Sequence, residues 1–181
     1  MRTSCIPPPL RDLFIRLAQT GIVRARWTET IHDEWVRNVL RDNPQIPAER
    51  LARARSLMNE AVRDCLVHGY EDLINSLTLP DPNDRHVLAA AIRGGAEFIV
   101  TCNLKDFPGE MLARFDIEAR HPDDFLLSLI DAAPGPVCSA LKRQREGLHN
   151  PPRTADELLV TLESLGLPQA VARLREFIEL L

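Results

Sequence analysis

Several patterns that identify common enzyme classes are missing from this chain of 181 residues. It contains no Gly-x-Ser-x-Gly, no Walker phosphate-binding loop and no Gly-x-Gly-x-x-Gly, so the usual nucleophile and nucleotide-loop motifs are absent. No apolar run reaches the roughly 20 residues that a membrane-spanning helix needs, and no secretory signal is visible. We therefore expect a cytoplasmic protein with no membrane partner.

An excess of basic charge is missing as well. The formal net charge of −4 argues against a strongly basic nucleic-acid coat, although it leaves room for a local basic patch. There is no Cys-x-x-Cys pair, and the five histidines show no zinc-binding spacing. We expect reduced thiols in the core at the four scattered cysteines, Cys5, Cys65, Cys102 and Cys138.

What is present is enough apolar sequence to build a core, since 45% of the residues are hydrophobic. Helical periodicity alternates with short apolar runs, which predicts an α/β fold with three layers and a short central parallel sheet. Strands are expected over residues 22–27, 66–67, 98–100 and 115–118. Helices are expected over residues 10–20, 28–43, 47–65, 123–132 and 137–147, with two more after residue 154. A further helix is expected after a cap at Asp81 or Asn83, with an apolar stretch over residues 87–92.

A linker is predicted at Asn150-Pro151-Pro152, because Asn-Pro and Pro-Pro pairs interrupt regular structure. We therefore expect a main domain over residues 1–149 and a helical C-terminal extension over residues 150–181. Thr154 and Glu157 have the spacing of a capping box, which predicts where the first helix of that extension begins.

The most informative stretch runs from Leu79 to Phe107. Two prolines delay the start of a helix, Gly94-Gly95 ends it, and the apolar run Phe98-Ile99-Val100 follows as a buried strand. Polar residues occur at the start of the helix and just past the end of the strand. Because ligands of open α/β sheets bind at the carboxyl ends of strands, these residues are expected to share one site.

The candidate site residues are carboxylates and one amide: Glu34, Asp81, Asp84, Asn103 and Asp106. Carboxylates that gather in a pocket repel one another, and a hard divalent cation such as Mg²⁺ or Mn²⁺ relieves that repulsion. Each residue also has a plainer interpretation. Asp81, Asp84 and Asp106 could cap helical turns, Glu34 could be a solvated helix residue, and a structural role is expected for His86.

Four segments together resemble the PIN-domain ribonucleases: PLRDLFIRLA, WTETIHDEWVRNVL, PDPNDRHVLAAAI and FIVTCNLKDF. They look closest to a bacterial branch that includes toxins of the VapC type, and the resemblance covers about residues 8–130. The tail around NPPRTADELL is similar to an extension found in that branch.

The resemblance implies a ribonuclease that holds Mg²⁺ or Mn²⁺ in an acidic cluster. Glu34 matches the helix acid, Asp84 the acid that opens DRHVLAAA, and Asn103 and Asp106 the polar positions after the strand, with Asp81 as a further match. An RNA substrate, an antitoxin partner and a homodimer are implied with it. The chain could also be a catalytically inactive PIN scaffold that binds protein or RNA, or a flap-type DNA nuclease.

The N-terminus departs from the family pattern over residues 1–8. Family members open on a buried strand that carries an aspartate, whereas no aspartate precedes Asp12 here. Reading the codons of Met-Arg-Thr-Ser-Cys-Ile-Pro one base earlier allows Asp-Ala-Asn-Val-Leu-Tyr-Pro, the family opening. We hypothesise that this segment is translated out of frame, which would remove one metal ligand and weaken both stability and activity.

Overall fold

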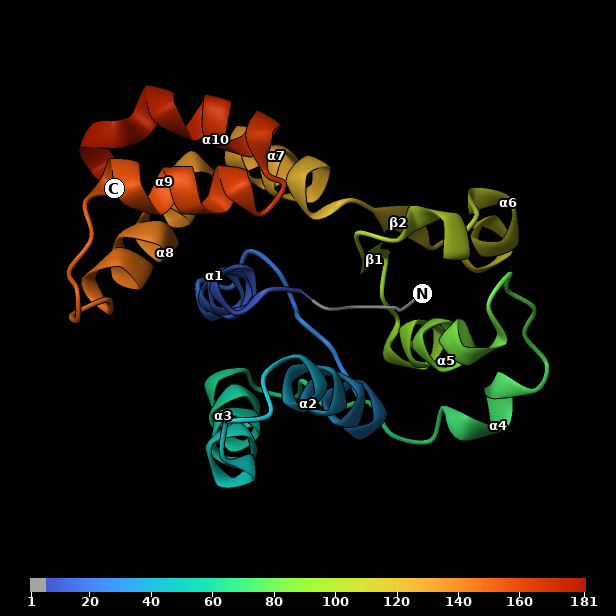
Figure 1. Ribbon diagram of the computed structural model, residues 1–181. Helices are drawn as coiled ribbons and strands as arrows, with labels where there is room; N and C mark the ends of the chain where they lie inside the picture. Colours follow the sequence, from blue (N-terminus) through green and yellow to red (C-terminus); the bar gives the residue numbers. More distant parts are fainter. Residues whose placement is uncertain (1–5) are drawn as a thin grey trace. The chain divides into compact units, whose positions relative to one another are not determined.

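The computed structural model of the protein describes residues 6–181, which divide into two compact units (Figure 1). One unit is formed by residues 25–120, and the other by residues 6–24 together with residues 121–181. Each unit has its own hydrophobic core. The second unit is therefore discontinuous in sequence, because a helix near the N-terminus folds with the C-terminal helices. The hypothesis about the reading frame falls mainly on residues 1–5, outside the described part of the chain.

The unit of residues 25–120 combines short helices and 3₁₀ turns with a small sheet. Its elements are α2 (Glu29–Asp42), α3 (Ala48–Ala61), α4 (Glu71–Ile74), η1 (Pro82–Asp84), α5 (Arg85–Gly94), β1 (Phe98–Val100), η2 (Leu104–Asp106), α6 (Gly109–Leu112), η3 (Ala113–Phe115) and β2 (Glu118–Arg120).

The sheet consists of β1 and β2, which run parallel with Phe98 opposite Glu118 and Val100 opposite Arg120. Ile99, between them, is buried in the core of this unit. The prediction of an α/β fold with a short parallel sheet is therefore confirmed, and the strand at residues 98–100 was placed correctly. Because β1 ends at Val100, the polar residues that follow it lie just beyond the carboxyl end of the strand.

Three strand predictions were wrong in extent. The second strand begins at Glu118 because residues 113–115 form a 3₁₀ turn and Asp116 takes a left-handed conformation with φ of 56°. The expected strands at residues 22–27 and 66–67 are reduced to one isolated parallel bridge between Trp27 and Leu66. Trp27 makes both backbone hydrogen bonds of this bridge. Its amide donates to the Cys65 carbonyl at 2.8 Å, and its carbonyl accepts from the Val67 amide at 2.9 Å.

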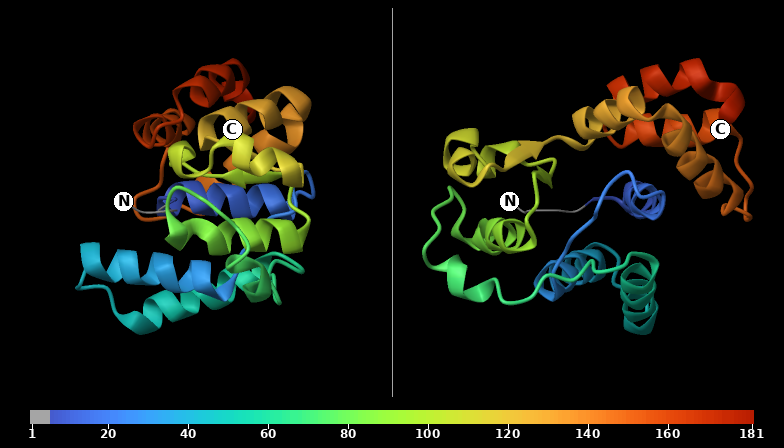
Figure 2. Two further views of the ribbon diagram at one scale, coloured as in Figure 1. Left: turned by 90° about the vertical axis from the view of Figure 1, so that its right-hand side faces the viewer. Right: turned by 180° about the vertical axis from the view of Figure 1, so that it is seen from behind.

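Helices α2 and α3 lie side by side (Figures 1 and 2) and are joined, together with Trp27, by a partly buried polar network. Asn59 Oδ1 accepts from Trp27 Nε1 at 2.8 Å and lies 2.9 Å from His32 Nε2. Trp35 Nε1 lies 2.9 Å from His32 Nδ1. An indole only donates, so Nδ1 of His32 accepts and Nε2 carries the proton. This network holds the α2 surface that carries Glu34 in a defined orientation.

Helix α2 begins where the sequence predicts it. Thr28 is fully buried and its hydroxyl accepts from the Ile31 amide at 3.1 Å, which satisfies one of the free amides of the first turn. Helix α5 ends at Gly95, whose φ of 62° is a left-handed conformation that glycine adopts without strain. Leu88, Ala89 and Ala90 of α5 are buried in the core of this unit.

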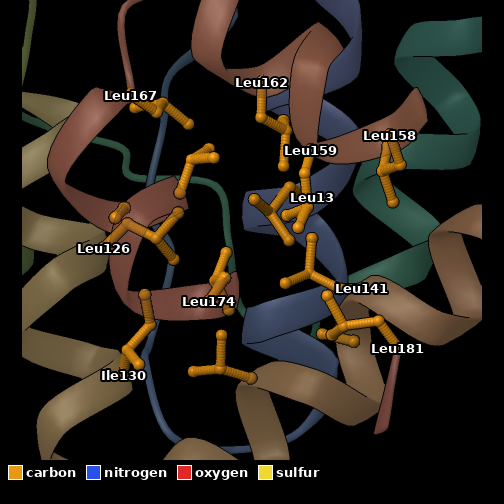
Figure 3. Close-up of a cluster of buried hydrophobic side chains, with 14 of the residues drawn as sticks. Leu13, Leu126, Ile130, Leu141, Leu158, Leu159, Leu162, Leu167, Leu174 and Leu181 are labelled. Atoms are coloured by element: carbon orange, nitrogen blue, oxygen red, sulfur yellow. The ribbon is translucent and has the colours of Figure 1, made fainter. Parts of the chain in front are cut away.

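The second unit is a helical bundle made of α1 (Pro8–Gln19), α7 (Pro122–Ala132), α8 (Pro134–Glu146), α9 (Ala155–Ser164), α10 (Pro168–Leu174) and the 3₁₀ segment η4 (Arg175–Leu180). Leu13 of α1 lies among leucines from the other helices (Figure 3). The capping box of Thr154 and Glu157 is confirmed, since the hydroxyl and the carboxylate each accept from the other residue's amide.

The boundary between residues 149 and 150 stays a prediction. Both sides of it lie in the bundle unit, where a tight set of buried leucines connects α8 to α9. Among the cysteines that the structure describes, Cys65 and Cys138 are free and buried as expected, whereas Cys102 is free but exposed because it lies past the end of β1. No helix within residues 6–181 is long and apolar enough to cross a membrane.

Candidate metal centre

Three aspartates from two segments meet in the unit of residues 25–120. Asp81 precedes η1 and its carboxylate accepts from the Asn83 amide at 2.9 Å. Asp84 ends η1 and leads into α5, whereas Asp106 ends η2, six residues after β1. One oxygen of each carboxylate lies within 4.8 Å of the corresponding oxygens of the other two. The helix start and the strand end therefore converge on one point.

Burial makes this cluster electrostatically unfavourable by itself. Asp84 is 2% exposed and Asp106 is 8% exposed. Burial, followed by the charges of Asp81, Asp106 and Glu34, raises the pKa of Asp84 to about 6. Asp84 Oδ2 is also buried with no hydrogen-bond partner among residues 6–181. A buried carboxylate oxygen without a partner is costly, and a cation at this point would satisfy it.

Asn103 acts on the cluster through Asp106. Its Nδ2 donates to Asp106 Oδ2, and its backbone amide donates to the buried Thr101 hydroxyl at 3.1 Å. The amide side chain therefore orients one oxygen of Asp106. Asn103 therefore positions the carboxylate of Asp106 and is not itself one of the three clustered carboxylates.

Glu34 reaches the same region from α2 but lies outside the set of three. Its Oε1 is 3.1 Å from His86 Nε2, and the charge of Glu34 contributes to the raised pKa of Asp84. Its Oε2 is buried with no hydrogen-bond partner in the described part of the chain. Glu34 thus provides a second buried carboxylate oxygen for which residues 6–181 supply no donor.

The donor set fits a hard divalent ion. Carboxylate oxygens are preferred by Mg²⁺ and Mn²⁺, which keep several waters and need only a few protein ligands. Asp81, Asp84 and Asp106 offer one oxygen each within a short span, and Glu34 adds negative charge nearby. The three ligating groups are all carboxylates, and the nearby His86 is bonded to Glu34, so this donor set does not favour a soft ion.

The sequence did not reveal the full role of one residue in this region, His86. The structural role expected for His86 did not include a bond to Glu34, which is 52 positions away in the chain. The available signal was its position two residues after Asp84 on the same helix. That spacing places it near the acidic cluster, but only the tertiary structure could identify its partner on α2.

The chain belongs to the PIN domain family, because residues 7–105 match that family over more than half of the chain. The matched range includes Glu34, Asp81, Asp84 and Asn103 and ends one residue before Asp106. Residues 122–176 match the family described as VapC50 C-terminal domain. The resemblance predicted from the sequence motifs is therefore confirmed.

One curated relative is a protein of Mycobacterium tuberculosis named "Putative ribonuclease VapC50". It is 42% identical to this chain over 109 residues, which are 59% of this chain and 62% of the relative. The chain thus spans less than two thirds of that protein's length. No solved structure was found to match the chain.

Proposed function

We propose that this protein is a Mg²⁺- or Mn²⁺-dependent endoribonuclease of the PIN class that hydrolyses RNA phosphodiesters as the toxin of a toxin–antitoxin pair. The observation that carries the proposal is the cluster of Asp81, Asp84 and Asp106, in which a buried oxygen of Asp84 lacks a partner among the described residues. Membership of the PIN domain family and the name of the relative, a putative ribonuclease, support it.

In this proposal Asp84 and Asp106 hold the ion, together with Asp81 and Glu34. When bound, the ion supplies a water of lowered pKa and offsets charge on the scissile phosphate. The residues of the chain hold the donor oxygens in place. The charge of a bound ion would favour the ionised form of Asp84, whose pKa is raised by burial and by the neighbouring acids. Asn103 fixes one oxygen of Asp106, and burial of Asp84 limits the water that would otherwise compete for its oxygens.

The test is cleavage of a mixed RNA substrate in Mn²⁺ buffer by the purified chain and by the Asp84→Asn variant. Outer-shell partners of metal sites are worth about 10–100-fold, so loss of a direct ligand should reduce the rate by at least about 100-fold. Glu110→Gln is the matched control, because it also replaces a carboxylate by an amide but lies on the exposed surface of α6. Equal rates in the parent and Asp84→Asn would reject the assignment.

A second candidate is a catalytically inactive PIN scaffold that acts through protein or RNA contacts. The observation in its favour is the sequence before Asp12, which contains no aspartate to serve as the first ligand of the family pattern. An inactive scaffold would take up no Mn²⁺ in calorimetry and would cut no RNA. Mn²⁺ uptake that disappears in Asp84→Asn favours the nuclease.

The partners follow from the same proposal. The toxin would be neutralised by a cognate antitoxin protein in the cytoplasm and would form a homodimer. Light scattering of the purified chain reports the mass of the assembly, for which twice 20.4 kDa is the expected value. Co-purification with the product of a small neighbouring gene, together with loss of RNA cleavage in that complex, is the expected outcome for an antitoxin.

A further inference from the structure

The candidate metal centre has one neighbour that offers no oxygen to an ion. His86 lies on α5, is 8% exposed, and directs Nε2 at Glu34 Oε1 on α2 at 3.1 Å. Both residues belong to the unit of residues 25–120. The bond therefore connects two helices inside one compact unit, at the edge of the acidic cluster.

The direction of this hydrogen bond follows from its chemistry. An ionised carboxylate only accepts, so Nε2 of His86 carries the proton and donates it to Glu34 Oε1. The donation assigns the two oxygens of Glu34 different roles. Oε1 is held by the imidazole, whereas Oε2 is buried and has no hydrogen-bond partner in residues 6–181.

If the His86–Glu34 bond served only to join α2 and α5, the buried Oε2 of Glu34 would destabilise the folded state. Burying a carboxylate is expensive, and an oxygen without a donor adds to that cost. Asp84 Oδ2 is in the same condition, and the charges of Asp84 and Glu34 act on one another. These two carboxylate oxygens are buried and find no donor in the described part of the chain, which is best explained by a shared positive ligand.

We propose that His86 is a positioning residue, which holds Glu34 by one oxygen so that the other remains directed to the divalent ion or to its water. The inference rests on the proposed function, because it assumes the ion. Histidine–carboxylate bonds next to a metal commonly orient its ligands. Here α5 serves twice, since Asp84 at its start supplies an oxygen and His86, two residues later, holds the carboxylate from α2.

The test measures Mn²⁺ binding itself at one pH, by the loss of the electron paramagnetic resonance signal of free Mn²⁺. His86→Gln and His86→Met have similar length, but only the glutamine can donate to Glu34 Oε1. Removing an outer-shell partner weakens metal binding by about 10–100-fold, so we expect that loss in His86→Met and its rescue in His86→Gln. His68→Met, at an exposed histidine of the same unit, is the matched control.

A double-mutant cycle with Glu34→Gln separates positioning from general stabilisation. If His86 acts through Glu34, adding His86→Met to Glu34→Gln should cause little further loss of Mn²⁺ affinity. A full additive loss, or equal losses in His86→Gln and His86→Met, overturns the proposal. Circular dichroism monitors folding, and if His86→Met fails to fold, His86→Leu takes its place in the same cycle.

The two proposals fail in different ways. If the parent chain takes up no Mn²⁺, the metal-dependent function falls and the role of His86 falls with it. If the parent and His86→Met bind Mn²⁺ equally while Asp84→Asn does not bind it, the proposed function stands and only the role of His86 is refuted.

Discussion

At the scale of single residues, the decisive fact is that Asp84 is both buried and surrounded by other acids. Its oxygens lie close to those of Asp81 and Asp106, and the negative charge of Glu34 adds to theirs. The pKa of about 6 measures how much this environment disfavours the ionised form. A residue in that position is destabilising unless a cation offsets its charge, which connects stability to ligand binding.

The first prediction concerns stability without metal. The pKa of Asp84 is higher in the folded chain than its ordinary value of 3.8, so the folded state is favoured by protonation and loses stability as the pH rises towards 6. Above that pH the loss amounts to about 3 kcal/mol. In chelator, Asp84→Asn should therefore be more stable than the parent at pH 7.5, and the difference should vanish near pH 4.

Urea unfolding of both proteins at the two pH values measures this effect. Glu110→Gln should show no such pH-dependent difference, because its side chain is exposed on α6. If the difference in unfolding free energy between Asp84→Asn and the parent is the same at pH 4 and at pH 7.5, Asp84 has an ordinary pKa and the prediction is wrong.

The second prediction concerns metal and pH together. Metal ligands must be deprotonated, so Mn²⁺ competes with the proton on Asp84 below pH 6. The apparent Mn²⁺ affinity should fall roughly tenfold per pH unit in that range and level off above it. Thermal unfolding with and without Mn²⁺ at pH 5.0 and 7.5 checks this, and an equal increase in melting temperature at both values would contradict it.

At the scale of elements, helix starts carry much of the local specificity. Thr28 begins α2, and the capping box of Thr154 and Glu157 begins α9, both as the sequence predicts. The start of α10 depends on a residue far away in the chain. Asp123 of α7 is 3% exposed and accepts from the amides of Gln169 at 3.1 Å and Ala170 at 2.8 Å.

The third prediction follows from this distant cap. Asp123→Ala removes two buried bonds to a charged acceptor and leaves the first amides of α10 without a partner, which should cost about 2–3 kcal/mol of unfolding free energy. Asp124→Ala is the matched control, because its carboxylate accepts from the Gln169 side chain in an exposed hydrogen bond and caps no helix amide among the bonds of residues 6–181. Chemical denaturation of the two variants should show a clearly larger loss for Asp123→Ala; equal losses would refute the cap.

The sequence failed to predict the ends of those elements that depend on contacts with other segments. The region of residues 22–27 has the composition of a strand, yet only Trp27 pairs, and its partner is Leu66. The end of α3 is four residues earlier than periodicity indicates, since the chain leaves the helix at Val62. In both cases a tertiary pairing overrides the local preference.

At the scale of the whole molecule, the chain folds as two units whose boundaries differ from simple sequence order. Helix α1 lies within the residues that match the PIN domain family, but Leu10, Leu13 and Leu17 are fully buried in the core formed with α7 to α10. The residues that match the VapC50 C-terminal domain therefore cover an apolar face of the N-terminal helix.

The fourth prediction is that a chain ending at Arg120 loses the partner of this face. Three leucines that are fully buried in the full chain would be exposed, at about 2 kcal/mol for each side chain. The shortened protein should bind a hydrophobic dye and aggregate, whereas the full chain should do neither. A monodisperse fragment with no dye binding would show that α1 finds another cover.

The sequence by itself determined the class of fold, the PIN family and the residues that could serve the site. Periodicity, turn residues and acidic positions next to a strand end are local properties, and they were enough to select Asp84, Asn103 and Asp106. Only the tertiary structure decided which of them meet, that His86 bonds to Glu34, and that α1 packs with the C-terminal helices. Those are contacts between segments far apart in the chain, which depend on packing that local patterns do not encode.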